Sequence, residues 1–144
     1  MDLKKEADIR LISRQFESEG AEAEQTEVMS QGTFEVTEEG FGIEYEESEA
    51  TGYEGAVTRL ESFGTGKVIM SRTGSVTSNM VVHTGEKHHC IYGTLYGNFE
   101  VGVEARKIVN DLTEKGGRLF FSYVVDINSS YLGLFEIEVE VKLR

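Results

Sequence analysis

The segment Phe135–Leu143, FEIEVEVKL, decides the fold of this chain. Its odd-numbered residues are all apolar, while its even-numbered residues are glutamates and a lysine. Successive side chains of a β-strand point to opposite faces, so this alternation predicts a strand with one buried face and one face in water. The segment therefore predicts a sheet that covers a core on one side.

Similar alternation, or a short apolar run, recurs along the chain between glycine-rich turns. Further strands are expected at Asp8–Glu17, Glu27–Thr37, Phe41–Tyr45, Ala56–Phe63, Lys67–Arg72, Phe99–Ala105 and Arg118–Asn128. Counting weaker segments, we expect about ten strands and no helix of about 10–12 residues. Residues Asn110–Gly117 are read either as one helical turn or as a wide hairpin loop that ends at paired glycines.

A meander of consecutive hairpins leaves two unpaired sheet edges, and closing the sheet into a barrel removes them. The sequence thus predicts an all-β protein, with an antiparallel up-and-down meander closed into a barrel of about 8–10 strands. This arrangement is favoured over a two-sheet sandwich. Residues 1–144 are expected to form a single domain, with a flexible N-terminus and a flexible acidic loop near residues 18–25.

The formal net charge of −12 is unevenly distributed. Residues 1–66 carry 17 acidic and 5 basic side chains, whereas residues 67–144 carry 9 of each. A negative surface repels phosphate backbones and anionic lipid headgroups, so neither nucleic acid nor a membrane is an expected partner. The neutral half is the better candidate for a protein interface, including that of a homodimer.

A single cysteine, Cys90, cannot form an internal disulfide, which is typical of a reducing compartment. The N-terminus has no apolar signal-peptide core, and no apolar run is long enough to span a bilayer. The sequence therefore predicts a cytoplasmic protein. It contains no recognisable catalytic arrangement or cofactor motif, and we expect neither catalytic residues nor a cofactor.

The chain's three histidines lie close to its cysteine, in the pattern His83, His88, His89 and Cys90. A zinc ion needs ligands that converge, but neighbouring strand residues point to opposite faces. His88 and Cys90 can share a face that His89 cannot join, and His83 lies across the predicted turn Thr84-Gly85-Glu86-Lys87. The preferred interpretation is therefore exposed imidazoles and a buried thiol, with no metal site. If two of the histidines cluster, a response to pH near their ordinary pKa is the alternative.

Arg72 is the most informative charged residue, because it shares a strand face with Val68 and Met70. If that face looks into the barrel, the guanidinium lies in the lumen or at its end, where an unpaired charge is costly. Arg72 is then either half of a structural ion pair or an anchor for an anionic ligand. The structural pair is the preferred interpretation.

Aromatic residues at inward positions are a further candidate feature: Tyr45, Phe99, Phe121, Tyr123 and Phe135. They either fill the core or line a cavity in which tyrosine hydroxyl groups orient a ligand. The candidate ligand-binding residues are therefore Arg72, Tyr45 and Tyr123.

Three segments together resemble a known family: VIMSRTGSV at residues 68–76 with Met80–Val82 after it, GTLYG at residues 93–97, and NDLTEKGGRLFFSY at residues 110–123. In this order and spacing the chain resembles the YwiB-like proteins, a bacterial family of unknown function, from Glu27 to Val141. The resemblance implies a calycin-like, that is lipocalin-like, β-barrel in the cytoplasm. It implies no reaction.

Two functions remain open. The first is a non-enzymatic module that binds a small, partly apolar and potentially anionic molecule inside the barrel. The alternative is a solid-core structural or protein-interaction domain that acts through its surface or as a homodimer. An enzyme is the least favoured class, since no set of convergent catalytic groups can be proposed.

Overall fold

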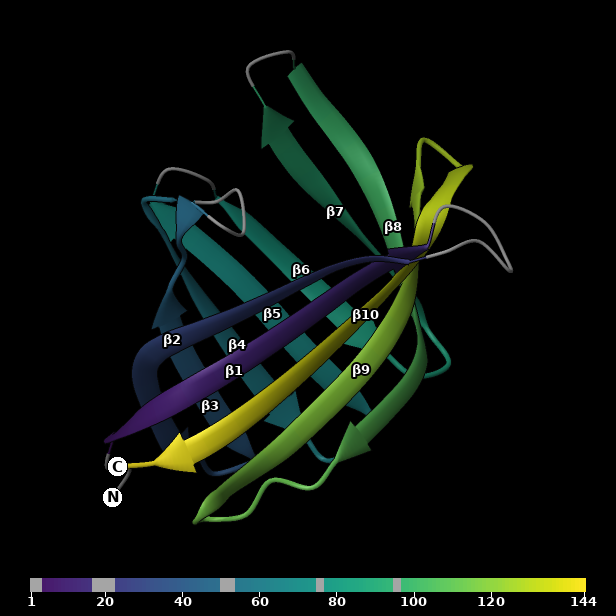
Figure 1. The fold of residues 1–144 in the computed structure, drawn as a ribbon. Coiled ribbons are helices and arrows are strands. Elements are labelled where there is room, and N and C mark those ends of the chain that lie inside the picture. The colour runs from purple at the N-terminus through teal and green to yellow at the C-terminus, as the bar shows by residue number, and fades with distance from the viewer. Residues whose placement is uncertain (1–3, 17–22, 50–53, 75–76, 95–96) are drawn as a thin grey trace.

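Ten antiparallel strands form one sheet in the computed structural model of the chain, which describes residues 4–16, 23–49, 54–74, 77–94 and 97–144 (Figure 1). The strands are β1 (Lys5–Phe16), β2 (Glu24–Val36), β3 (Phe41–Glu46), β4 (Ala56–Phe63), β5 (Lys67–Gly74), β6 (Ser78–His83), β7 (Lys87–Thr94), β8 (Gly97–Asn110), β9 (Gly116–Ile127) and β10 (Ser130–Leu143). The predicted all-β class and strand number are confirmed. The described residues include no helix long and apolar enough to cross a bilayer.

The strand predicted from alternation alone is the C-terminal part of β10. Ile137, Val139 and Val141 are buried there, as their spacing predicts. β10 pairs with β9 on one side and with β1 on the other, so the two terminal strands of the chain lie side by side. This pairing closes the sheet where a simple meander would leave both of its edges free.

The hydrogen-bonded sheet is interrupted between β6 and β7, which are consecutive in the chain but form the two ends of the strand order. In the described ranges no ladder joins them, and single bridges occur near their turn, at His83–Glu86 and between Thr84 and Ala105 of β8. The β7–β8 hairpin leans away from β6 toward the upper end of Figure 1. The predicted barrel is therefore confirmed as a nearly closed one. We call the interruption between β6 and β7 the seam.

Two hydrogen bonds are made by the β4–β5 turn, at the end of the barrel where β6 and β8 finish. There the side-chain amide of Asn110 donates a hydrogen bond to the carbonyl of Gly64 at 2.9 Å. The backbone amide of Thr84 donates to the carbonyl of Gly66, also at 2.9 Å. The first contact ties the end of β8 to the β4–β5 turn, and the second continues the β5–β6 pairing beyond the end of β6.

β8 extends beyond the predicted strand Phe99–Ala105 to Asn110. The second half was not predicted because a β-bulge interrupts the alternation of buried and exposed residues. The register with β9 shifts between Ala105 and Lys107, which inserts one extra residue into β8. An extra residue moves every later side chain to the opposite parity, so Ile108 is buried although the spacing from Ala105 is odd. A strict two-residue period ends at the bulge, and the prediction ended there with it.

The segment Asn110–Gly117 is a hairpin rather than a helical turn: Asn110 ends β8, Gly116 begins β9, and residues 111–115 connect them. The backbone groups of Thr113 and Gly116 exchange hydrogen bonds of 2.8 and 3.0 Å. Gly116 and Gly117 have φ angles of +98° and +129°, a region that side-chain-bearing residues rarely adopt. The paired glycines are therefore needed for the chain to turn into β9.

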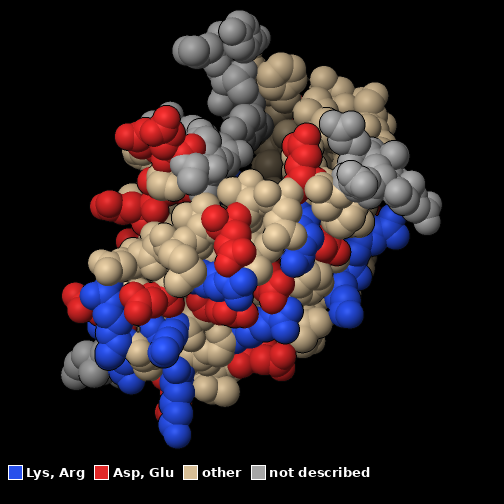
Figure 2. All heavy atoms as spheres, viewed as in Figure 1, with Lys and Arg blue, Asp and Glu red and all other residues tan. Residues whose placement is uncertain are grey.

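The inner faces of the strands form one hydrophobic core. Its largest members, all almost completely shielded from solvent, include Phe34, Phe121, Ile9, Ile43, Leu60 and Leu119. On the outer face, ion pairs link neighbouring strands: Arg10 contacts Glu27 and Glu140, and Arg14 contacts Glu136 and Glu138. Figure 2 shows this intermingling of basic and acidic side chains over the β1 and β10 face.

The predictions for the first residues and for the acidic loop near 18–25 fall mainly outside the described residues, which omit 1–3 and 17–22. Within that loop, Glu24 and Gln25 already belong to β2, where Gln25 pairs with Arg14 of β1.

Candidate functional site

A half-open cavity of about 230 Å³ lies at the end of the barrel where β5 finishes. Its walls come from the inner faces of β1, β2, β3, β5, β9 and β10, together with Glu47, which directly follows β3. The lining residues include all three predicted ligand-binding residues, Arg72, Tyr45 and Tyr123. Strand alternation thus located these side chains correctly.

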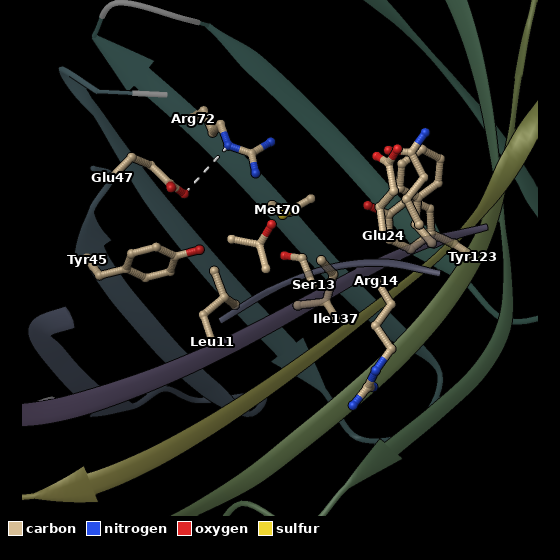
Figure 3. Close-up of a pocket in the computed structure, with 13 residues that line it drawn as sticks. Leu11, Ser13, Arg14, Glu24, Tyr45, Glu47, Met70, Arg72, Tyr123 and Ile137 are labelled. Atoms are coloured by element: carbon tan, nitrogen blue, oxygen red, sulfur yellow. Dashed lines mark ion pairs between the residues drawn. The ribbon is translucent and has the colours of Figure 1, made fainter. Parts of the chain in front are cut away.

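Arg72 reaches the cavity because it shares the inward parity of Met70, which is 4% exposed. The Arg72 Nε atom lies 3.8 Å from the Glu47 Oε1 atom, as the dashed line in Figure 3 marks. The Glu47 side chain is 1% exposed and that of Arg72 is 15% exposed. The same Glu47 oxygen accepts a hydrogen bond of 2.6 Å from the Thr58 hydroxyl group on β4. The preferred interpretation of Arg72, a pair with an inward carboxylate, therefore agrees with this geometry.

Glu47, the charged partner of Arg72 in the cavity wall, was missed by sequence reasoning. Phe41, Ile43 and Tyr45 were assigned to one face of a strand from their spacing, and Glu47 occupies the next position of the same series. A carboxylate at an inward position was therefore detectable. The prediction stopped at Tyr45 because the apolar pattern stopped there, whereas the chain keeps its direction for two more residues.

The Tyr45 side chain also interacts with Glu47, and its hydroxyl group is directed into the cavity (Figure 3). Burial raises the pKa of the Tyr45 hydroxyl group, and the negative charge of Glu47 raises it further. Tyr45 therefore remains a neutral phenol, which can both donate and accept a hydrogen bond.

Replacing Tyr45 with phenylalanine should weaken the loss of stability at alkaline pH. Above a pH of about 10 the unfolded chain releases the phenol proton while the folded chain keeps it, so the folded state loses about 1.4 kcal/mol per pH unit from this group. Urea unfolding between pH 9 and pH 11 would measure that slope. Tyr131→Phe, at a residue that is 59% exposed, is the matched control. Equal slopes for wild type and Tyr45→Phe would contradict the expectation.

Three aromatic rings continue from the core into the cavity wall. Phe121 stacks on Tyr123 with ring centroids 5.9 Å apart, and Tyr123 stacks on Phe135 at 5.5 Å. Phe121 is fully buried, whereas Tyr123 and Phe135 line the cavity. Core filling therefore describes Phe121, whereas cavity lining describes Tyr123 and Phe135. Phe99 lies outside this cavity.

Charged groups at the cavity margin include Glu24 and Arg14, but they lie differently. Glu24 is the first residue of β2 and lines the cavity, whereas the Arg14 side chain points away from the other labelled residues (Figure 3). Arg14 contacts Gln25, Glu136 and Glu138 on the outer face of the barrel. The interior charges are thus Arg72 and Glu47, which offset each other.

The histidines and the cysteine do not line this cavity. His83 and His88 approach each other, with ring centroids 5.4 Å apart, and both contact Glu86 rather than Cys90. His89 is exposed. Cys90 is only half-buried, and desolvation raises the pKa of its thiol. His83 and His88 are therefore partly exposed and form the two-histidine cluster that was the alternative, whereas the thiol that was expected to be buried is half-buried.

The sequence matches the model of a protein family over residues 9–139, and this family is described as a domain of unknown function, DUF1934. The match covers all but the ends of the chain. The chain belongs to this family. No curated protein matches the chain.

Among solved structures, the crystal structure of the YwiB protein from Bacillus subtilis is similar to this member of the DUF1934 family. It superposes with a TM-score of 0.70 over 95% of this chain and 92% of that chain, at 21% sequence identity. The resemblance to YwiB-like proteins, inferred from three short segments, is therefore confirmed, as is the barrel that it implies. At this identity the likeness concerns the fold, and the cavity must be interpreted from its own residues.

Proposed function

We propose that this member of the DUF1934 family is a non-enzymatic binding module that holds a small, partly apolar molecule in the cavity at the end of β5. The observation that supports it is the composition of the cavity wall. Leu11, Met70 and Ile137 provide an apolar surface, and the Arg72–Glu47 pair lies beside them. Binding sites for small molecules combine such apolar walls with a few polar groups in fixed positions.

The polar groups favour a ligand with both a hydrogen-bond acceptor and a donor. Arg72 only donates, Glu47 as a carboxylate only accepts, and the Tyr45 hydroxyl group can do either. Because Glu47 offsets the charge of Arg72, a fully anionic headgroup gains less from this cavity than Arg72 alone would suggest. A neutral headgroup such as a carboxamide fits the pair better than a carboxylate does.

The cavity volume limits the size of the ligand. Sites for drug-sized molecules usually measure about 300–1,000 Å³, and this cavity of about 230 Å³ is smaller. A short chain with a polar end fits this volume, and a longer molecule would extend through the open side.

Hexanamide and hexanoate form a suitable pair of probes, since they share an apolar chain and differ in the charge of the headgroup. We expect both to shift amide NMR signals of cavity residues, with hexanamide binding more tightly. Ser13→Leu should block binding of both by filling the cavity from β1. Ser71→Leu, on the opposite face of β5 from Met70, is the matched control and should bind like the wild type. Equal responses from the two variants, or none from the wild type, would count against the proposal.

A second candidate function is an interaction domain that forms a homodimer along the seam. It is supported by the strand edges of β6 and β7, which have no ladder partner within the described part of the chain, and by Ile91 of β7, which is 62% exposed. Unpaired strand edges readily pair with another chain. Both strands also belong to the electrically neutral half of the sequence. Native mass spectrometry of protein purified from its host separates the candidates, because a bound small molecule and a dimer differ in mass.

A further inference from the structure

A cluster of potential metal ligands surrounds the turn between β6 and β7, remote from the cavity. His83 is the last residue of β6, Glu86 follows in the turn, and His88 is the second residue of β7. Gly85 has a φ angle of +80°, which lets the chain reverse within this short segment. The reversal brings one ring nitrogen of His83, one of His88 and a carboxylate oxygen of Glu86 within 4.8 Å of one another.

The spacing of these atoms matches that of ligands around one ion. The Glu86 Oε2 atom lies 3.5 Å from His83 Nδ1 and 3.3 Å from His88 Nε2. Two atoms bound at about 2.05 Å to a tetrahedral zinc ion are about 3.3 Å apart, from the bond length and the tetrahedral angle. The carboxylate oxygen is therefore already about as far from each nitrogen as two ligands of one zinc ion are from each other. Only the two imidazole rings would need to move closer together for an ion to bind.

The donor atoms themselves are available to an ion. The His83 Nδ1 atom is buried and has no hydrogen-bond partner among the described residues. The His88 Nε2 atom contacts only the Glu86 carboxylate among the hydrogen bonds of the described chain. With an ion bound, each imidazole would be neutral and would carry its proton on the other ring nitrogen, so that both lone pairs face the ion.

Two lysines lie near this cluster, and each is held elsewhere. Lys67 faces His83 in the β5–β6 register, but its Nζ atom lies 4.5 Å from the centre of the Phe63 ring. Lys87 precedes His88 and forms an ion pair with Asp126 of β9. Neither ammonium group therefore occupies the position between the two imidazoles.

We propose that His83, Glu86 and His88 form a site for a divalent ion of the zinc type. Two imidazoles and one carboxylate suit zinc and its neighbours copper and nickel, whereas magnesium and calcium prefer oxygen ligands throughout. Three protein ligands leave a fourth position for water or for an external ligand. The ion would join the end of β6 to the start of β7, at the seam where the sheet lacks a ladder.

The site is independent of the cavity function. His83 pairs in register with Lys67 at the start of β5, whereas Arg72 lies near the end of the same strand. Five residues of extended chain separate these positions by roughly 17 Å. If hexanamide does not bind, the proposal of a metal site is therefore unaffected. If zinc does not bind, the proposed function of the cavity is unaffected.

Isothermal titration of the full chain with zinc chloride tests the proposal. We expect one zinc ion per chain, no heat from magnesium chloride, and a loss of affinity of at least about 100-fold in the His83→Ala/His88→Ala variant, since even outer-shell changes cost up to that much. His89→Ala is the matched control, because His89 is adjacent but exposed, and it should retain wild-type affinity. Circular dichroism confirms that each variant is folded.

Histidine ring NMR signals give a second measurement, and only three histidines need assignment. Zinc should shift the rings of His83 and His88 and leave that of His89 unchanged, and Glu86→Gln should weaken the shift. Absence of zinc binding by the folded wild type would overturn the proposal. So would a loss of binding in Cys90→Ser or His89→Ala as large as that in the double histidine variant, because the ligands would then be different ones.

Discussion

Replacing Phe121 with alanine should lower the free energy of unfolding by about 3–5 kcal/mol, the cost usual for removing a buried aromatic ring. Phe121 has no exposed surface, and it stacks against Tyr123 at the base of the cavity wall. Its neighbours are held by the β8–β9 and β9–β10 ladders, where Phe121 pairs with Ile108 and Ile137. The strands therefore have little freedom to collapse into the space that the ring leaves.

Urea or thermal unfolding of Phe121→Ala measures this loss directly. Met29→Ala is the matched control, because Met29 lies on β2 with 67% of its surface exposed and should change stability by no more than about 0.5 kcal/mol. A domain of this size is stable by roughly 5–15 kcal/mol, so the Phe121 variant is expected to be folded but close to its limit. A loss below about 1 kcal/mol would mean that the core repacks around the missing ring.

The inward-facing residues were predictable because strand parity is a local property. Once the Phe135–Leu143 period was recognised, the same rule put Tyr45, Tyr123 and Arg72 on inner faces, and all three line one cavity. The rule needs only the identity of residues two positions apart. It would equally have found Glu47, had the series been continued past the last apolar residue.

Features that depend on contacts between distant segments were not predictable in this way. The bulge after Ala105 changes parity without any glycine or proline to mark it. The seam lies in the middle of the chain because β1 and β10 pair, and nothing within β6 or β7 specifies that pairing. Glu86 was read as a turn residue, since its approach to two imidazoles depends on how tightly the turn closes.

Replacing Arg72 with methionine should destabilise the protein by about 3 kcal/mol, at the lower end of the range for breaking a buried ion pair. The change removes the positive charge and leaves the Glu47 carboxylate, which is 1% exposed, inside the barrel. The hydrogen bond from Thr58 remains, but it is not a counter-charge. An Arg72 that served only as a ligand anchor would instead give a nearly neutral change in stability, which urea unfolding would reveal.

A double-mutant cycle with Glu47→Gln determines the contribution of the pair itself. The Glu47→Gln change keeps a side-chain oxygen for the Thr58 hydroxyl group while removing the charge, so Arg72→Met combined with Glu47→Gln should recover most of the stability lost by Arg72→Met alone. Lys142→Met, at an exposed position on β10, controls for the loss of a positive charge without burial. The double variant also separates structure from binding. If it is stable yet no longer distinguishes hexanamide from hexanoate, the pair both supports the barrel and selects the headgroup. If it still distinguishes them, Arg72 and Glu47 are structural residues, and the selectivity comes from the tyrosines.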